Sequence, residues 1–120
     1  QAKSFSFMQV DASRVAGMNE NIAMLLMAAK AGIPVCPHAG GVGLCEMVQH
    51  VAMFDFVAVG GKHPDRVVEF VDHLHEHFVV PTDIKKGHYM APLKPGAGAE
   101  MFAKSISDFT YPTGKEWVNA

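Results

Sequence analysis

The stretch that decides the fold is IPVCPHAGGVGLCEMVQHV, residues 33–51. Its first five residues form a short apolar run of the length of a buried strand. A glycine-rich turn follows at residues 39–43, and apolar residues then recur at i, i+3, i+4 and i+7, as on one face of a helix. They are Leu44, Met47, Val48 and Val51. The stretch therefore predicts one strand–turn–helix unit, with His38 at the carboxyl end of the strand.

A similar unit precedes this one in the chain. Residues 6–10 are a second apolar run, which ends at Asp11 and predicts another strand. Asn19 is expected to cap the helix that follows, because Asn is a favoured residue at that position. The apolar face of this helix is predicted to comprise Ile22, Leu25, Leu26 and Ala29.

A third unit is predicted after residue 51. Residues 56–59 are expected to form a strand, and a helix is expected from about Asp65 to His77. Its apolar face would comprise Val67, Phe70, Val71, Leu74 and Phe78. Alternating strands and helices with short connections predict an α/β fold with parallel strands. Three units are too few to close an eight-stranded barrel, so they form either a small open sheet or the last part of a larger barrel.

Composition excludes several classes of protein. The chain has 120 residues, 49% hydrophobic and 18% charged, which suits at most one globular domain. A net charge of −2 gives no electrostatic reason to expect nucleic acid or a membrane as partner. The chain opens on Gln1, so we expect the true start to lie upstream. Cys36 and Cys45 match no redox or zinc spacing, which favours free thiols in a reducing compartment, here the cytoplasm.

Asp11 and His38 are candidate catalytic residues because each follows a predicted strand. Ligands bind at the carboxyl ends of parallel strands, and consecutive strands are usually neighbours. A carboxylate beside an imidazole fixes its tautomer, which suits general acid or base chemistry. The alternative is a capping Asp and an unrelated core or surface His, and spacing alone leaves both open.

Two other patterns carry weaker signals. The glycines of residues 40–43 fit neither the dinucleotide pattern nor the P-loop pattern, so a tight turn is favoured over phosphate binding. On a helix, Glu69, His73 and His77 would form one stripe at i, i+4 and i+8, which could hold a metal ion. His75 lies within the same cluster. The alternative, a solvated polar helix face, is favoured.

Five segments together resemble L-fuconate dehydratases of the enolase superfamily, in its mandelate racemase-like subgroup. Residues 11–15 (DASRV) and 37–50 (PHAGGVGLCEMVQH) are similar to the sixth and seventh barrel strands of that family, and residues 69–78 to the segment after its eighth strand. Residues 89–92 and 94–96 resemble its C-terminal stretch. Ala16, where the family often has Gly, and residues 60–63 depart from the pattern.

The resemblance implies the C-terminal βα units, strands 6–8, of a TIM-like barrel of the (β/α)8 or (β/α)7β type, incomplete on its own. Residues 1–86 would then be the barrel part, and residues 87–120, whose beginning is rich in Gly and Pro, would return to pack on the capping domain.

The same resemblance implies a hydro-lyase reaction on a sugar acid. In the family, a Lys removes the proton alpha to the carboxylate, Mg²⁺ stabilises the enediolate, and a His protonates the departing hydroxyl. That role falls to His38, with Asp11 as its orienting partner, and Glu69 matches a glutamate of the substrate site, where His38 also lies. The expected product from L-fuconate is 2-keto-3-deoxy-L-fuconate.

The family's Lys-x-Lys motif and its three carboxylate metal ligands have no match in these 120 residues. We therefore expect Mg²⁺ with no ligand from this chain, and the N-terminal portion of the same enzyme as partner, as a separate chain or cleaved fragment. A homo-oligomer of the full enzyme is also expected. The alternatives are another acid-sugar dehydratase or racemase of the superfamily, a non-catalytic fragment, and a metal-binding protein that uses the His cluster.

Overall fold

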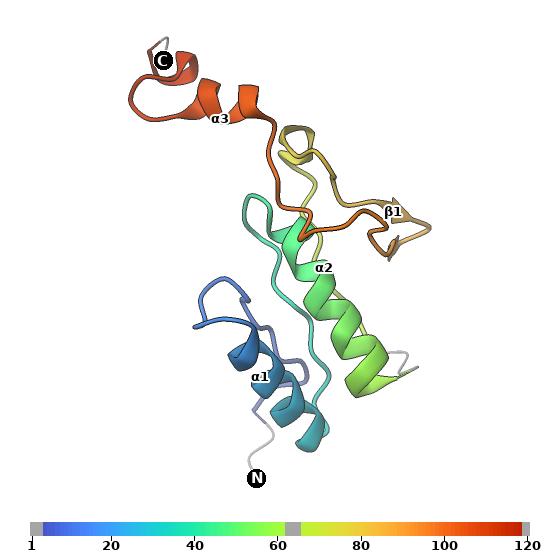
Figure 1. Cartoon of the computed structure of the whole chain (residues 1–120). Helices are drawn as coiled ribbons and strands as arrows, with labels where there is room; N and C mark the ends of the chain where they lie inside the picture. The colour runs from blue at the N-terminus through green and yellow to red at the C-terminus, as the bar shows by residue number, and fades with distance from the viewer. Residues whose placement is uncertain (1–3, 62–65, 119–120) are drawn as a thin grey trace.

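The computed structural model describes residues 4–61 and 66–118, and its elements run along an elongated chain (Figure 1). The principal extents are 54 × 30 × 24 Å. Helices dominate, and the described strands are short. The elements are α1 (Met18–Lys30), α2 (Leu44–Phe54), a π-helix (Asp55–Gly60), a 3-10 helix (His75–His77), β1 (Ile84–Lys85), β2 (His88–Tyr89), α3 (Ala103–Phe109) and α4 (Lys115–Val118).

The first two predicted strands are extended and pair in parallel. A parallel bridge joins Met8 to Val35. On either side of it, the Cys36 and His38 amides donate to the carbonyls of Met8 and Val10, at 3.0 and 2.9 Å. The parallel order predicted from the alternating pattern is confirmed for this pair of segments, although the pairing is short.

The third predicted strand is wrong. Residues 56–59 lie within the π-helix, which continues directly from α2. A run of four apolar residues fits a buried strand or a helix segment equally well, and periodicity cannot separate the two. The helix carries Asp55 into a buried position, where it pairs with Arg66, and the chain turns only at Gly61, whose φ is 55°.

The predicted helix from Asp65 to His77 is wrong as well. Asp65 lies outside the described residues, residues 66–74 contain no helix, and only the short 3-10 helix His75–His77 forms. The Glu69 amide instead donates to the Pro37 carbonyl at 3.2 Å. β-branched residues at 67, 68 and 71 favour extended backbone, and pairing with the second strand outweighs the weak helical spacing.

Two small cores hold the chain together. The first joins α1, α2 and the paired strands through Val10, Leu25, Ala28, Val35 and Val51. The second lies under the turn after His38 and comprises Ala39, Leu44, Cys45 and Val48.

Helix α1 presents a different face from the predicted one. It begins at Met18 with Gly17 as N-cap, so Asn19 does not cap it. Asn21 is buried instead, and its side-chain amide donates to the Gly17 carbonyl at 2.9 Å. Leu25 is buried as predicted, whereas Leu26 is 52% exposed.

A hairpin spans the start of the segment that is rich in Gly and Pro. β1 and β2 pair antiparallel, with Ile84 opposite Tyr89. The two residues between them, Lys86 and Gly87, have φ of 53° and 76°, the positive values that a two-residue hairpin turn needs. The predicted division between residues 86 and 87 thus falls between the two turn residues. The assignment of residues 87–120 to a capping domain stays a prediction.

The far end of the molecule carries α3 and α4, neither of which has a buried residue. Among the described residues, no helix has the length and apolar character that crossing a bilayer would require.

The turn before α2 generates a first prediction. Gly43 has a φ of 74°, and a Cβ there would lie 2.9 Å from the Phe78 ring. Gly43→Ala should combine left-handed strain with overpacking and destabilise the protein by about 3 kcal/mol. Gly32, with a φ of 70° and open space around it, is the matched control. Gly32→Ala should cost only about 1–2 kcal/mol. Urea unfolding measures both, and equal losses would contradict the packing role given to Phe78.

Candidate acid–base site

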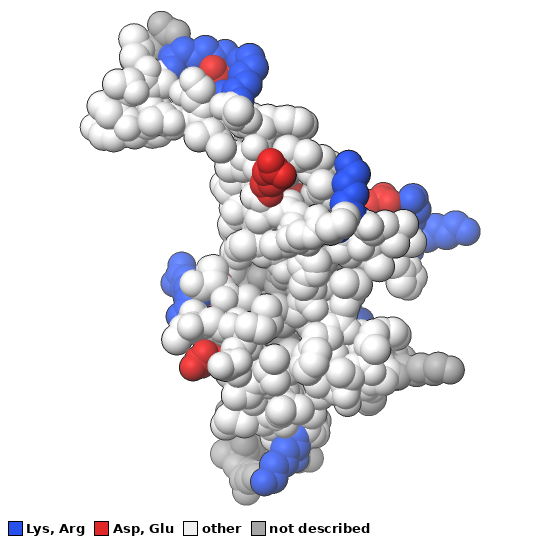
Figure 2. Space-filling model, in the orientation of Figure 1, with Lys and Arg blue, Asp and Glu red and all other residues white. Residues whose placement is uncertain are grey.

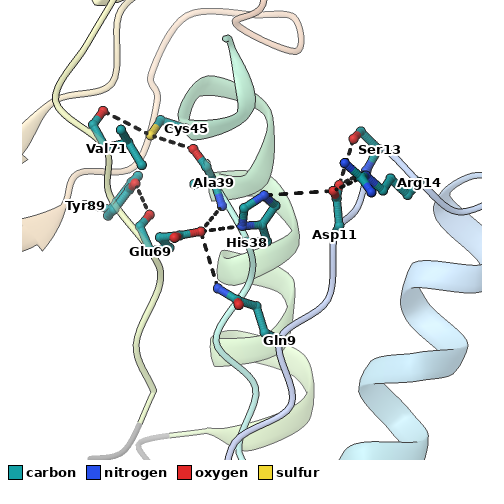
Figure 3. Close-up of polar contacts among 10 residues, drawn as sticks. All are labelled: Gln9, Asp11, Ser13, Arg14, His38, Ala39, Cys45, Glu69, Val71 and Tyr89. Carbon is teal, nitrogen blue, oxygen red and sulfur yellow. Dashed lines mark hydrogen bonds and ion pairs between the residues drawn. The ribbon is translucent and has the colours of Figure 1, made fainter. Parts of the chain in front are cut away.

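The backbone pairing of three extended segments places the three candidate residues side by side, in a row across those segments. Because Met8 pairs with Val35, three residues further along each strand Asp11 comes level with His38. The bond from the Glu69 amide to the carbonyl that precedes His38 brings Glu69 level with it on the other side. Figure 3 shows the His38 ring between the two carboxylates, which come from separate segments of the chain.

The His38 ring contacts the two carboxylates unequally. Its Nδ1 lies 2.6 Å from Glu69 Oε2, which is a strong hydrogen bond. Its Nε2 lies 3.9 Å from Asp11 Oδ2, within ion-pair range but too far for a hydrogen bond. When Glu69 Oε2 is the acceptor of this bond, Nδ1 carries the proton and points it toward Glu69. Nε2 is then the nitrogen available for proton exchange with a substrate.

One oxygen of Glu69 gathers three donors. Besides His38 Nδ1, the Ala39 amide donates to Oε2 at 2.7 Å and the Gln9 side-chain amide donates to it at 3.3 Å (Figure 3). These donors come from two neighbouring extended segments. Glu69 is therefore tied to both paired strands through its side chain, and its position is fixed before any ligand arrives.

Asp11 is held by the loop that follows it. The hydroxyl and amide of Ser13 donate to Asp11 Oδ1 at 2.7 and 3.0 Å, and Arg14 Nε lies 3.0 Å from Oδ2. The Ser13 hydroxyl lowers the pKa of Asp11 most, and partial burial opposes it without reversing the direction. Asp11 is consequently an ionised carboxylate at neutral pH.

His38 contacts both other predicted site residues, Asp11 and Glu69, and several of their partners were not predicted from the sequence. Ser13 and Arg14 had a recognisable signal, since Asp followed two residues later by Ser often closes a turn onto its own side chain. Gln9 lies two residues before Asp11 and so faces the same side of the strand. Tyr89 lies in the segment 89–92 that resembles the family, but nothing local predicts that its hydroxyl donates to the Glu69 carbonyl at 2.6 Å, because it approaches from a hairpin twenty residues away.

The histidine cluster is dispersed, and the metal-binding hypothesis for it is wrong. Without a helix, Glu69, His73 and His77 form no stripe. His75 Nδ1 contacts Glu46 Oε1 at 2.6 Å, and His77 Nδ1 contacts the Ser105 hydroxyl at 3.0 Å. Across residues 4–61 and 66–118, no group of three or more His, Cys, Asp or Glu side chains could hold a metal ion.

The preference for a solvated polar face is also incorrect for two of these histidines. The side chains of His75 and His77 are only 19% and 20% exposed. His75 is stacked on Phe70, with ring centroids 5.4 Å apart. These histidines therefore join segments of the fold to one another.

The chain matches a family model described as "Enolase C-terminal domain-like" over residues 1–105. Two named proteins are similar to this chain in sequence. Mitochondrial enolase superfamily member 1 of Homo sapiens is 51% identical over 117 residues, which cover 98% of this chain and 26% of that protein. L-galactonate dehydratase of Hypocrea jecorina is 50% identical over 111 residues, 92% of this chain and 24% of that protein.

A solved structure agrees with the fold described above. The crystal structure of human mitochondrial enolase superfamily member 1 matches with a TM-score of 0.91 at 50% identity, over 95% of this chain and 26% of that one. The chain thus spans about a quarter of the length of the proteins it resembles.

The buried pair of Glu46 and His75 generates a second prediction. The Glu46 side chain is 1% exposed, and its Oε1 contacts His75 and also accepts from the Thr82 amide at 3.2 Å. His75→Ala would leave this buried carboxylate without its imidazole partner and destabilise the protein by about 3 kcal/mol. Burial lowers the pKa of His75, but the hydrogen bond to Glu46 and further contacts outweigh it, and the net shift is upward. The stabilisation is then complete below the ordinary His pKa and is lost as the pH rises through the raised value.

Thermal unfolding at about pH 6 and about pH 9 tests this, because the gap between wild type and variant should narrow at the higher pH. The exposed His73 is the control, and His73→Ala should change stability by less than about 0.5 kcal/mol. A gap that widens with pH would show that the pair is not a charged one.

Proposed function

This chain belongs to the enolase C-terminal domain-like family of the enolase superfamily, and from that premise we propose that it carries the acid half of an acid-sugar dehydratase site. The observation that carries the proposal is the His38–Glu69 hydrogen bond of 2.6 Å, in a row with Asp11 at the ends of parallel segments. Ligands of parallel α/β folds bind at these ends. Nε2 of His38 is the proton-transfer atom in this arrangement.

The proposed reaction removes water from a sugar acid in two stages. A base supplied from outside this chain takes the proton alpha to the carboxylate and leaves an enediolate. The electron pair then forms the C2–C3 double bond while the C3–O bond breaks, and Nε2–H of His38 protonates the departing hydroxide to water. The resulting enol becomes a 2-keto-3-deoxy acid. Glu69 keeps the Nδ1 proton in place throughout, and Asp11 provides a negative charge near Nε2.

The described residues do not fit a Mg²⁺ site. Within residues 4–61 and 66–118, no three His, Cys, Asp or Glu side chains are arranged to hold a metal ion, and the site carboxylates Asp11 and Glu69 are engaged by His38, Ser13, Arg14 and Ala39. Mg²⁺ assists enolase-superfamily chemistry by stabilising the enediolate. We propose that its ligands lie in the portion of the relatives' length that this chain does not span.

L-fuconate is the substrate we propose, with L-galactonate as the nearest competitor. L-fuconate is the 6-deoxy form of L-galactonate, and one relative bears the name L-galactonate dehydratase. A further acid-sugar dehydratase or a racemase of the superfamily is the alternative. Comparing initial rates on the two acids decides among them, since a racemase would return the epimer without any keto acid. The cytoplasm remains our proposed compartment.

Exposed apolar surface supports a partner chain or segment. Among the described residues, twenty large hydrophobic side chains are exposed, including Met27 at 70% and Val57 at 77%. Figure 2 shows a broad middle region with few charged side chains, and Lys and Arg gathered mainly near α3 and the hairpin tip. The radius of gyration is 16.5 Å, against about 14 Å for a compact domain of this length. We propose that the N-terminal portion of the same enzyme covers this surface, and that the full enzyme is a homo-oligomer.

A third prediction tests the role of His38. In the complete assembly, His38→Asn should lower dehydration of L-fuconate by ~10²–10⁴-fold, because the hydroxide then departs without general acid assistance. Exchange of the alpha proton with solvent should continue, since the base is not part of this chain. NMR in D₂O follows the C2 proton while a keto-acid assay follows elimination.

Asp11→Asn is the companion variant and should lose less, because it leaves the imidazole and its Glu69 contact in place. Near wild-type elimination by His38→Asn would overturn the assignment. Loss of exchange together with elimination would instead make His38 the base.

A fourth prediction concerns the partner. Expressed alone, this chain should associate or aggregate through its exposed apolar side chains, and a co-expressed N-terminal portion of the enzyme should co-purify with it. Size-exclusion chromatography with light scattering gives the stoichiometry. A folded, inactive monomer that does not bind the N-terminal portion would instead favour the alternative that this chain is a non-catalytic module.

A further inference from the structure

The Glu69 peptide breaks the pairing that the other extended segments follow. Met8 donates its amide to the Pro34 carbonyl at 2.9 Å and accepts at its own carbonyl from the Cys36 amide at 3.0 Å. A residue in a parallel pair thus bonds to two partner residues that flank the one opposite it. Glu69 makes the first of these two bonds, because its amide donates to the Pro37 carbonyl at 3.2 Å. Regular pairing would also require the Glu69 carbonyl to accept a bond from the Ala39 amide.

That second bond is replaced by two others. The Ala39 amide donates to the Glu69 carboxylate, at 2.7 Å, instead of to the Glu69 carbonyl. The carbonyl accepts from the Tyr89 hydroxyl at 2.6 Å (Figure 3). The carboxylate therefore takes over a main-chain donor, which holds its Oε2 against Nδ1 of His38.

Tyr89 is itself firmly placed. It lies on β2, opposite Ile84 across the hairpin, and packs against the core cluster under the turn after His38. The Phe70 ring meets it edge-on, with centroids 6.0 Å apart and an interplanar angle of 81°. Burial raises the pKa of Tyr89 far above its usual range, so the hydroxyl remains protonated and can donate.

We propose that Tyr89 is a positioning residue for the acid–base site. Its hydroxyl donates to the Glu69 carbonyl, so the Ala39 amide donates to the Glu69 carboxylate instead of to that carbonyl. The carboxylate held in this way fixes the imidazole of His38. This inference rests on the proposed dehydratase function for its kinetic consequence, but not for its geometry. It gives the hairpin of residues 84–89 a part in catalysis that no motif in the sequence indicates.

Kinetics of the complete assembly on L-fuconate, with L-galactonate as second substrate, test the proposal. Tyr89→Phe keeps the ring and removes the hydroxyl, so the Glu69 carbonyl can compete for the Ala39 amide. We expect kcat to fall about tenfold with KM changed less than about twofold, because competition from the carbonyl weakens the bond from the Ala39 amide to the charged Glu69 carboxylate, which positions His38 and does not bind substrate. Tyr111, whose side chain is 75% exposed, is the matched control, and Tyr111→Phe should leave kcat unchanged.

A double-mutant cycle separates positioning from general stability. If Tyr89 acts through the Glu69 carboxylate, Tyr89→Phe should change kcat less than about twofold in a Glu69→Gln background. The same tenfold loss in both backgrounds would overturn the proposal, as would a Tyr89→Phe enzyme of wild-type kcat.

An NMR titration reads the geometry without any activity. In the wild type, the Ala39 amide proton should follow the titration of a carboxylate, and Glu69→Gln should abolish that response. Tyr89→Phe should weaken it, because the amide turns toward the carbonyl. If neither acid is dehydrated or epimerised, the proposed function fails, and this titration still decides the inference. An Ala39 response that is unchanged in Tyr89→Phe would refute it.

Discussion

The parallel pairing of Met8 with Val35 is the constraint on which the candidate site depends. Side chains in a parallel pair that share a row point to the same side, so a register fixed at one bridge decides every later meeting along the two segments. Three residues onward, that register puts Asp11 beside His38. A slip by one residue would turn one of them to the opposite face and destroy the row. Asp11 therefore reaches the imidazole through this register, whereas Glu69 reaches it through the bond from its own amide to the Pro37 carbonyl.

The sequence was most informative where strand, turn and helix followed one another with short connections. There the apolar spacing and the turn glycines predicted α2, and Asp11 and His38 were found from their strand-end positions. After Phe54 the predicted elements are wrong, because residues 56–59 continue the helix and Glu69 instead bonds to Pro37. Local composition cannot decide which of two apolar runs pairs with a strand, because the deciding bonds come from residues about thirty positions away.

That failure explains why Glu69 was expected in the wrong local structure. It was placed on a helix, whereas it lies in the extended segment that pairs with the second strand. The family resemblance identified Glu69 as a site residue, and its position beside His38 indicates its physical role, which is to accept a hydrogen bond from the imidazole. Likewise, the exposed side of α1, with Leu26 at 52%, is a predicted core face that the described residues leave uncovered. The periodicity identified the apolar residues of α1 but did not predict which of them the chain buries.

A site that lies between segments must also control backbone atoms that a regular sheet would pair. At Glu69, regular pairing would bond the Ala39 amide to the Glu69 carbonyl, and the carboxylate could then adopt several rotamers. The hydroxyl of Tyr89 changes that balance, since the carbonyl is already satisfied and the amide is left for the carboxylate. A carboxylate fixed by a main-chain donor loses less entropy when it orients an imidazole than one fixed by the imidazole alone. The hairpin that presents Tyr89 is thus part of the structure around the site, even though it begins beyond the last predicted βα unit.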